Sequence, residues 1–167
     1  MDCRRLEIII ISANNLPKVE DLKVYAKVSV AGKSETEWRT PVDITGGTNP
    51  QWKYKISYTV EEEVVQHHGV DLNIKLYSEQ KFKDKYVGEV KLSLKKLFDE
   101  KDSGESRISC SVQMNDGGNG TLNISYSFGE IYVVKKPSIF VRSFQFLLAS
   151  FVGCPPNVCI DVDVTKP

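Results

Sequence analysis

The chain has 167 residues, a length that suits one domain with a tail better than two domains. Its 22 Lys and Arg balance its 22 Asp and Glu, so no overall charge favours binding to nucleic acid, and targeting by charge must come from a local patch. The apolar run after Arg5 ends by Ile11 and is too short for a secretory signal. We therefore expect a cytosolic chain with reduced thiols at Cys3, Cys110, Cys154 and Cys159.

Alternation of apolar and polar residues predicts an all-β fold. In chain order, we expect strands near residues 6–12, 25–30, 36–40, 51–58, 71–77, 86–93, 108–114 and 122–128. Residues 94–99 are the one helix expected inside this region, which argues against a parallel α/β layout. Eight short strands separated by turns predict an eight-stranded antiparallel Greek-key β-sandwich.

The clearest single stretch begins at Gly46 and continues through Pro50 into the strand at 51–58. Two glycines, an asparagine and a proline predict a turn, and Pro50 biases Asn49 toward an extended backbone. The strand then alternates, with four large apolar residues on one face: Trp52, Tyr54, Ile56 and Tyr58. We expect this face to contribute much of the core, since an aromatic side chain buries about 150–250 Å².

Residues 4–129 resemble a C2 domain, most closely the small plant C2 proteins of the cold- and defence-responsive kind. Five segments carry the resemblance in order: Leu16 after the first strand, residues 25–28 (Tyr-Ala-Lys-Val), 48–52 (Thr-Asn-Pro-Gln-Trp), 86–90 (Tyr-Val-Gly-Glu-Val) and 120–126 (Gly-Thr-Leu-Asn-Ile-Ser-Tyr). The resemblance implies the circularly permuted (type II) topology. It places one domain at residues 1–129 and a tail at 130–167.

C2 domains hold calcium between clustered aspartates in the loops at one end of the sandwich, and such a site needs several converging oxygens. At the matching positions this chain has Lys23 in place of an acidic residue, and Ser-Glu-Gln at 78–80 in place of Asp-x-Asp. An ammonium about 4 Å from a dication costs several kcal/mol. The resemblance thus implies weak or absent calcium binding, with four residual candidates: Glu20, Asp21, Glu79 and Asp84.

The loop after the strand at 71–77 is basic and carries one aromatic residue. Lysines that flank an aromatic ring suit a membrane interface, where the ring enters the headgroup layer and the ammonium groups pair with anionic lipid. The alternative is a solvated loop whose ring folds back onto the core. We predict lipid contact by Lys81, Phe82, Lys83 and Lys85.

The tail contains an apolar segment at 139–153, too short to span a bilayer. Its large apolar residues recur at helical spacing, which predicts a short amphipathic helix that lies on a membrane or binds a partner. Docking on the sandwich itself is the alternative, and acylation of Cys154 or Cys159 would strengthen a membrane role. The predicted contacts are Phe140, Phe144, Leu147, Leu148 and Phe151.

No nucleophile motif, phosphate-binding glycine loop or paired carboxylates point to an enzyme, and no cofactor is implied beyond weakly bound calcium. We expect a non-enzymatic module that binds anionic phospholipid with weak or no calcium dependence at the cytosolic face of the plasma membrane or another membrane, exchanging with the cytoplasm. Two alternatives remain: an adaptor for a membrane-associated protein, and calcium-dependent lipid binding. The resemblance implies a setting in stress or defence signalling.

Overall fold

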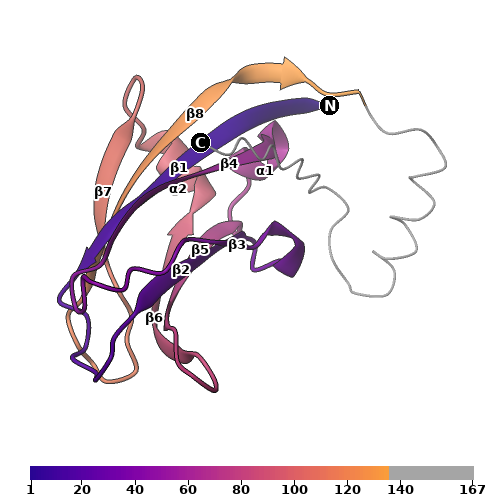
Figure 1. Ribbon diagram of the computed structural model, residues 1–167. Coiled ribbons are helices and arrows are strands. Elements are labelled where there is room, and N and C mark those ends of the chain that lie inside the picture. The colour runs from indigo at the N-terminus through magenta and orange to yellow at the C-terminus, as the bar shows by residue number, and fades with distance from the viewer. Residues whose placement is uncertain (136–167) are drawn as a thin grey trace.

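The structure is a computed structural model that describes residues 1–135, and these form eight strands with short helical segments between some of them (Figure 1). The strands are β1 (Asp2–Asn14), β2 (Val24–Val30), β3 (Trp38–Arg39), β4 (Gln51–Glu61), β5 (Asp71–Ser78), β6 (Lys85–Ser93), β7 (Ser106–Ser111) and β8 (Thr121–Val133). The helical segments are the 3-10 turn η1 (Ser34–Thr36) and the α-helices α1 (Glu62–Gln66) and α2 (Leu94–Asp99). The tail segment at 139–153, with its five predicted contact residues, lies outside the described residues.

The strands form two four-stranded sheets that pack face to face. One sheet has the order β4-β1-β8-β7 and the other β3-β2-β5-β6, and the neighbouring strands are antiparallel. Inward positions of both sheets form one buried apolar cluster, in which Ile8 and Ile10 of β1 and Ile74 and Leu76 of β5 have no exposed surface. This arrangement confirms the predicted antiparallel sandwich of type II C2-like topology.

The alternating face of β4 points into the core as predicted. Tyr58 is almost fully buried, and its hydroxyl donates toward the carbonyl oxygens of Val28 and Thr36, each 3.0 Å away. Burial raises the pKa of Tyr58, so the phenol stays neutral. Trp52 reaches the other sheet as well, because its indole nitrogen donates to the carbonyl of Val24 over 3.1 Å. Side chains of β4 therefore bond the two sheets together.

The turn before β4 is organised by the carboxylate of Asp43. One oxygen accepts from the backbone nitrogens of Thr45 and Gly46 at 2.8 and 2.7 Å, and the other accepts from that of Gln51 at 2.7 Å. A Cβ on Gly46 would lie 2.6 Å from the Cα of Pro50, so only glycine fits this position. Asp43 thus fixes the geometry that the glycine-proline stretch permits.

Several bounds differ from the expectation: β1 is longer at both ends, β4 continues to Glu61, and β7 ends at Ser111 rather than at residue 114. Three further differences have a visible cause. The strand expected at 36–40 is only two residues long, because the hydroxyl of Thr36 closes the η1 turn by bonding the backbone of Val30 and Lys33. The acidic run after β4 forms α1, in which the Glu62 carboxylate pairs with Arg4 of β1. β8 continues past residue 129 to Val133, since its last residues pair with the start of β1.

Candidate functional site

Three loops lie at one end of the sandwich: loop 1 (residues 15–23), loop 2 (residues 40–50) and loop 3 (residues 79–84). Backbone hydrogen bonds join them. The backbone nitrogen of Leu16 in loop 1 donates to the carbonyl of Thr48 in loop 2 over 3.0 Å. The backbone nitrogen of Glu79 in loop 3 donates to the carbonyl of Lys23 in loop 1 over 2.8 Å. Figure 1 shows loops 1 and 3 projecting from the same end, at the bottom of the view.

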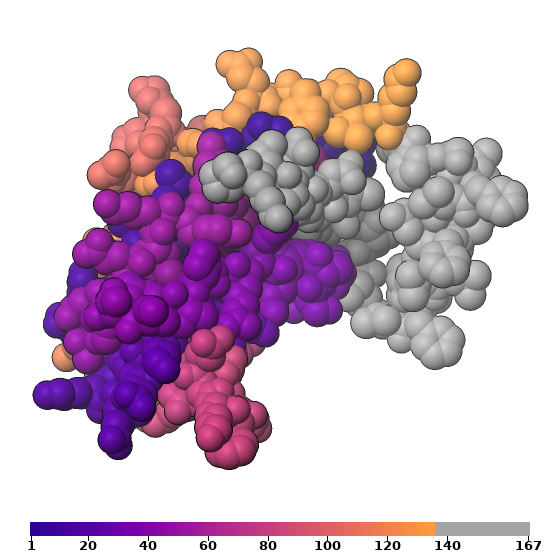
Figure 2. Space-filling model, viewed as in Figure 1, coloured from indigo at the N-terminus to yellow at the C-terminus, as the bar shows by residue number. Residues whose placement is uncertain are grey.

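Loop 3 projects from the surface in the space-filling view, as the pink projection at the lower edge of Figure 2. Phe82 is 94% exposed, and within residues 1–135 its ring makes one cation–π contact, with the ammonium of Lys81 5.7 Å from the ring centre. Lys83 and Lys85 are exposed too, and within the same described range none of these three lysines forms an ion pair. The alternative in which Phe82 folds back onto the core is therefore wrong, and the four predicted residues form one exposed basic and aromatic tip, here called the loop 3 tip.

The four calcium candidates do not come together as a metal site. Within the part of the chain that the structure describes, no three His, Cys, Asp or Glu side chains are grouped so that they could share a metal ion. Glu20 and Asp21 are exposed in loop 1, while the oxygens of Asp84 accept hydrogen bonds from the Tyr25 hydroxyl at 2.6 Å and the Gln80 nitrogen at 3.1 Å. The donor set does not fit a calcium ion, which needs six to eight oxygens.

The side chains behind loop 3 form a stacked row on the outer face of the second sheet. The ring of Tyr25 stacks on that of Tyr77, with centres 5.7 Å apart, and Tyr77 meets Tyr86 edge-on. The guanidinium of Arg39 lies 3.7 Å from the centre of the Tyr25 ring and donates to Glu79 over 3.1 Å. We call Arg39, Tyr25, Glu79 and Asp84 the loop 3 clamp.

Burial and hydrogen bonding together set the protonation states in the clamp. Burial, and then the hydrogen bond to Asp84, raise the pKa of Tyr25 to about 12. The same hydrogen bond from Tyr25, followed by that from the Gln80 backbone, holds the pKa of Asp84 below its ordinary value. Near neutral pH the pair is therefore a neutral phenol donating to a carboxylate.

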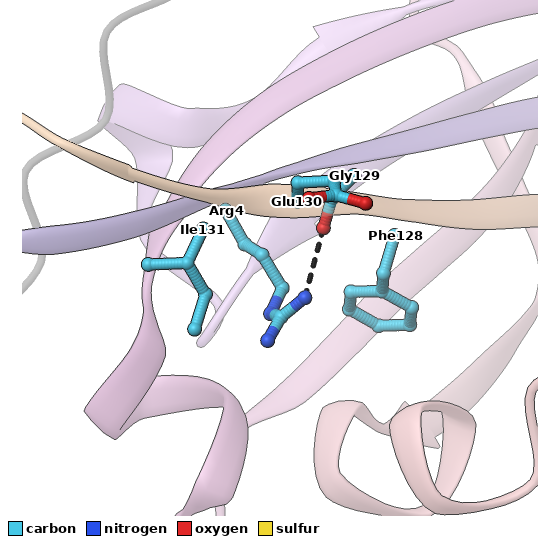
Figure 3. Close-up of a pocket in the computed structure, with 5 residues that line it drawn as sticks. All are labelled: Arg4, Phe128, Gly129, Glu130 and Ile131. Atoms are coloured by element: carbon cyan, nitrogen blue, oxygen red, sulfur yellow. Dashed lines mark hydrogen bonds between the residues drawn. The ribbon is translucent and has the colours of Figure 1, made fainter.

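The opposite end of β1 carries a pocket of about 350 Å³, lined by Arg4, Phe128, Gly129, Glu130 and Ile131 (Figure 3). The guanidinium of Arg4 is occupied, because it pairs with Glu62 and donates to the carbonyl of Gly129 over 2.9 Å. Roughly ten strand residues at about 3.3 Å each separate Arg4 from the loop end. We assign this pocket a structural role in seating α1 against the strands.

None of the helices in residues 1–135 has the length and apolar character needed to cross a membrane. Sequence reasoning identified the loop 3 tip, but it missed Arg39 and Tyr25 as partners of the loop. The outward positions of Tyr25 and Tyr77 on their strands are the one signal that pointed to an aromatic row there.

Comparisons with known proteins agree with the fold. Residues 4–110 match the C2 domain family. Protein SRC2 homolog of Arabidopsis thaliana is 34% identical over 138 residues, covering 79% of this chain and 43% of that protein, and Protein SRC2 of Glycine max is 34% identical over 138 residues, covering 78% and 48%. The chain thus spans less than half the length of these relatives. A C2 domain of plant Extended Synaptotagmin 1 superposes with a TM-score of 0.65 at 16% identity, covering 77% of this chain and 96% of that domain.

Proposed function

The chain belongs to the C2 domain family, and we propose that it is a non-enzymatic module that docks on anionic phospholipid membranes through the loop 3 tip, with little or no requirement for calcium. The observation that carries this proposal is the 94% exposure of Phe82 between lysines that form no ion pair within residues 1–135. An aromatic ring held in water beside three exposed ammonium groups has the chemistry of a membrane interface.

The expected binding energy is that of a reversible contact. Each basic residue near a charged leaflet contributes about 1 kcal/mol, so the three lysines contribute about 3 kcal/mol at low salt. Transfer of the Phe82 ring out of water adds about 2 kcal/mol. Together these contributions, about 5 kcal/mol, enrich the protein at the membrane by roughly three to four orders of magnitude, which permits exchange between membrane and cytoplasm.

Calcium is not expected to change this binding much. Both oxygens of Asp84 already accept hydrogen bonds, and one oxygen of Glu79 accepts from Arg39. The cytosolic face of the plasma membrane or another membrane is the proposed location, and the proposed setting in stress or defence signalling is by analogy with the small plant C2 proteins. The tail segment at 139–153 is proposed as an additional contact.

The test is co-sedimentation of the full chain with vesicles of phosphatidylcholine, with and without phosphatidylserine, in calcium and in chelator. A Lys81→Ala/Lys83→Ala/Lys85→Ala variant is compared with a control that loses the same charge elsewhere, Lys55→Ala/Lys96→Ala/Lys91→Ala, whose lysines lie in exposed ion pairs. We expect affinity for anionic vesicles to fall about a hundredfold in the first variant and little in the second.

Three further outcomes decide between the alternatives. Binding that ignores chelator and falls with salt supports the proposal, while binding that appears only with calcium supports the calcium-dependent alternative. The absence of vesicle binding in every condition overturns the proposal and leaves the adaptor for a membrane-associated protein. A chain ending after Lys135, which keeps all of β8, measures what the tail adds.

A further inference from the structure

Loop 3 is attached at both of its ends to strands that are distant in the sequence. At its start, Glu79 accepts from the guanidinium of Arg39 in β3 over 3.1 Å. At its end, Asp84 accepts from the hydroxyl of Tyr25 in β2 over 2.6 Å. The exposed residues Lys81, Phe82 and Lys83 lie between these two attachments.

We propose that Arg39 and Tyr25 are positioning residues that hold loop 3 in its projecting position by engaging Glu79 and Asp84, so that the loop 3 tip is presented to lipid without a metal ion. This inference rests on the proposed function, because it assigns a role to these residues in the same lipid contact. The carboxylates of Glu79 and Asp84 do not form a calcium site here, because they accept hydrogen bonds from Arg39, Tyr25 and Gln80. The proposal follows from this difference.

Arg39 supplies positive charge beside the two carboxylates of the loop. Its guanidinium pairs with Glu79 and lies over the Tyr25 ring, 3.7 Å from the ring centre. Its charge, with that of Lys27, also acts to lower the pKa of Asp84. A cation held by these contacts thus favours the ionised form of the carboxylates at the base of the loop.

Tyr25 supplies rigidity. Its side chain is only 2% exposed, and its ring is held between the Arg39 guanidinium and the ring of Tyr77. The hydroxyl therefore has a fixed position from which it donates to Asp84. A donor that is already in place confers order on its acceptor at little entropic cost.

The loop is also closed within itself. The second oxygen of Asp84 accepts from the backbone nitrogen of Gln80 over 3.1 Å, and this bond spans the loop. The side-chain amide nitrogen of Gln80 donates to the hydroxyl of Ser78 over 3.0 Å. Once Tyr25 fixes Asp84, the hydrogen bond to Gln80 fixes the opposite side of the loop. The tip then projects on a rigid base.

The test uses the full chain with Tyr25→Phe, which removes only the hydroxyl, and with Arg39→Gln, which removes the cation. Tyr77→Phe is the matched control, because it removes a hydroxyl from the neighbouring ring of the same stack while leaving the bond to Asp84 intact. Three quantities are measured in chelator: the amide hydrogen exchange of residues 79–85, the affinity for phosphatidylserine-containing vesicles, and the urea unfolding midpoint.

We expect Tyr25→Phe to speed hydrogen exchange of the Gln80 backbone amide about tenfold, because the charge-assisted hydrogen bond from Tyr25 to Asp84 is lost. The same variant should bind vesicles several-fold more weakly. Arg39→Gln should also speed exchange at Gln80 and weaken vesicle binding. Tyr77→Phe should change neither the exchange rate nor the affinity for vesicles. Unchanged exchange at Gln80 in Tyr25→Phe overturns the clamp whether or not vesicles bind. Faster exchange with unchanged vesicle affinity overturns the positioning role. Failure of the unmodified chain to bind vesicles counts against the proposed function instead, and the exchange data still decide whether the clamp exists.

Discussion

Replacement of Asp43 by alanine should destabilise the whole sandwich, because one carboxylate organises the turn that begins β4. Its two shortest hydrogen bonds, 2.7 Å each from the nitrogens of Gly46 and Gln51, are charge-assisted. At about 1.5 kcal/mol for each bond, Asp43→Ala should lower the free energy of unfolding by about 3 kcal/mol. Thr45 also donates to this carboxylate, through its nitrogen at 2.8 Å and its hydroxyl at 3.2 Å, and the sum above does not include these bonds.

Urea unfolding followed by tryptophan fluorescence measures this loss. Thr45→Val is the control, because it removes only the 3.2 Å hydroxyl contact and should cost less than about 0.5 kcal/mol. A loss below about 1 kcal/mol in Asp43→Ala would refute the assigned role of the carboxylate.

Acid provides a second check on the same residue. Burial acts to raise the pKa of Asp43, but hydrogen bonds from Gln51, Gly46 and Thr45 outweigh burial and hold the pKa below its ordinary value of 3.8. The stabilisation is therefore present above pH 3.8 and is lost as the pH falls through the lower pKa of the folded state. The stability difference between the unmodified chain and Asp43→Ala should shrink in that acid range. A difference that stays constant into strong acid would contradict the ionised state of Asp43.

Two substitutions test the packing, and a titration of the unmodified chain tests the clamp. Tyr58→Phe leaves two buried carbonyls without their donor and should cost about 1–3 kcal/mol in urea unfolding. Gly88→Ala should cost about 1–3 kcal/mol in the same assay, because a Cβ would lie 2.7 Å from Val112 and 2.8 Å from a backbone oxygen. Tyr25 should resist ionisation in an ultraviolet titration, and since its pKa rises from 10.0 to about 12, the stability that this shift confers is full below pH 10 and is lost as the pH rises toward 12. Ionisation of all tyrosines near pH 10 would contradict the buried hydrogen bond of Tyr25.

Most of the fold was predictable because a half-buried strand imposes a period of two on its sequence. The strand β5 and the helix α2 lie where the pattern placed them, within a residue at each end. The helix α1 was not predictable in this way, because five residues that begin with acidic side chains have little tendency to form a helix alone. Its Glu62 pairs with Arg4, which is 58 residues away in the chain.

The candidate site likewise has one part that adjacent residues predict and one part that depends on residues distant in the sequence. The loop 3 tip is a local feature, and its lysines and Phe82 could be recognised from adjacent residues. The clamp is not local, because Arg39 and Glu79 are 40 residues apart and Tyr25 and Asp84 are 59 residues apart. Their contact depends on the register of β2 against β3 and β5, which alternation alone does not fix.

Position 23 shows how the loop end tolerates a lysine where an acidic residue is usual in C2 domains. Loop 1 and loop 3 are joined here by the backbone of Lys23, whose carbonyl accepts from Glu79 over 2.8 Å and whose nitrogen donates to the hydroxyl of Ser78 over 3.4 Å. The Lys23 side chain is exposed and takes no part in either bond. A junction made by the backbone and by the clamp needs no bridging cation, so a basic side chain at this position adds to the positive charge of the loop end without weakening the fold.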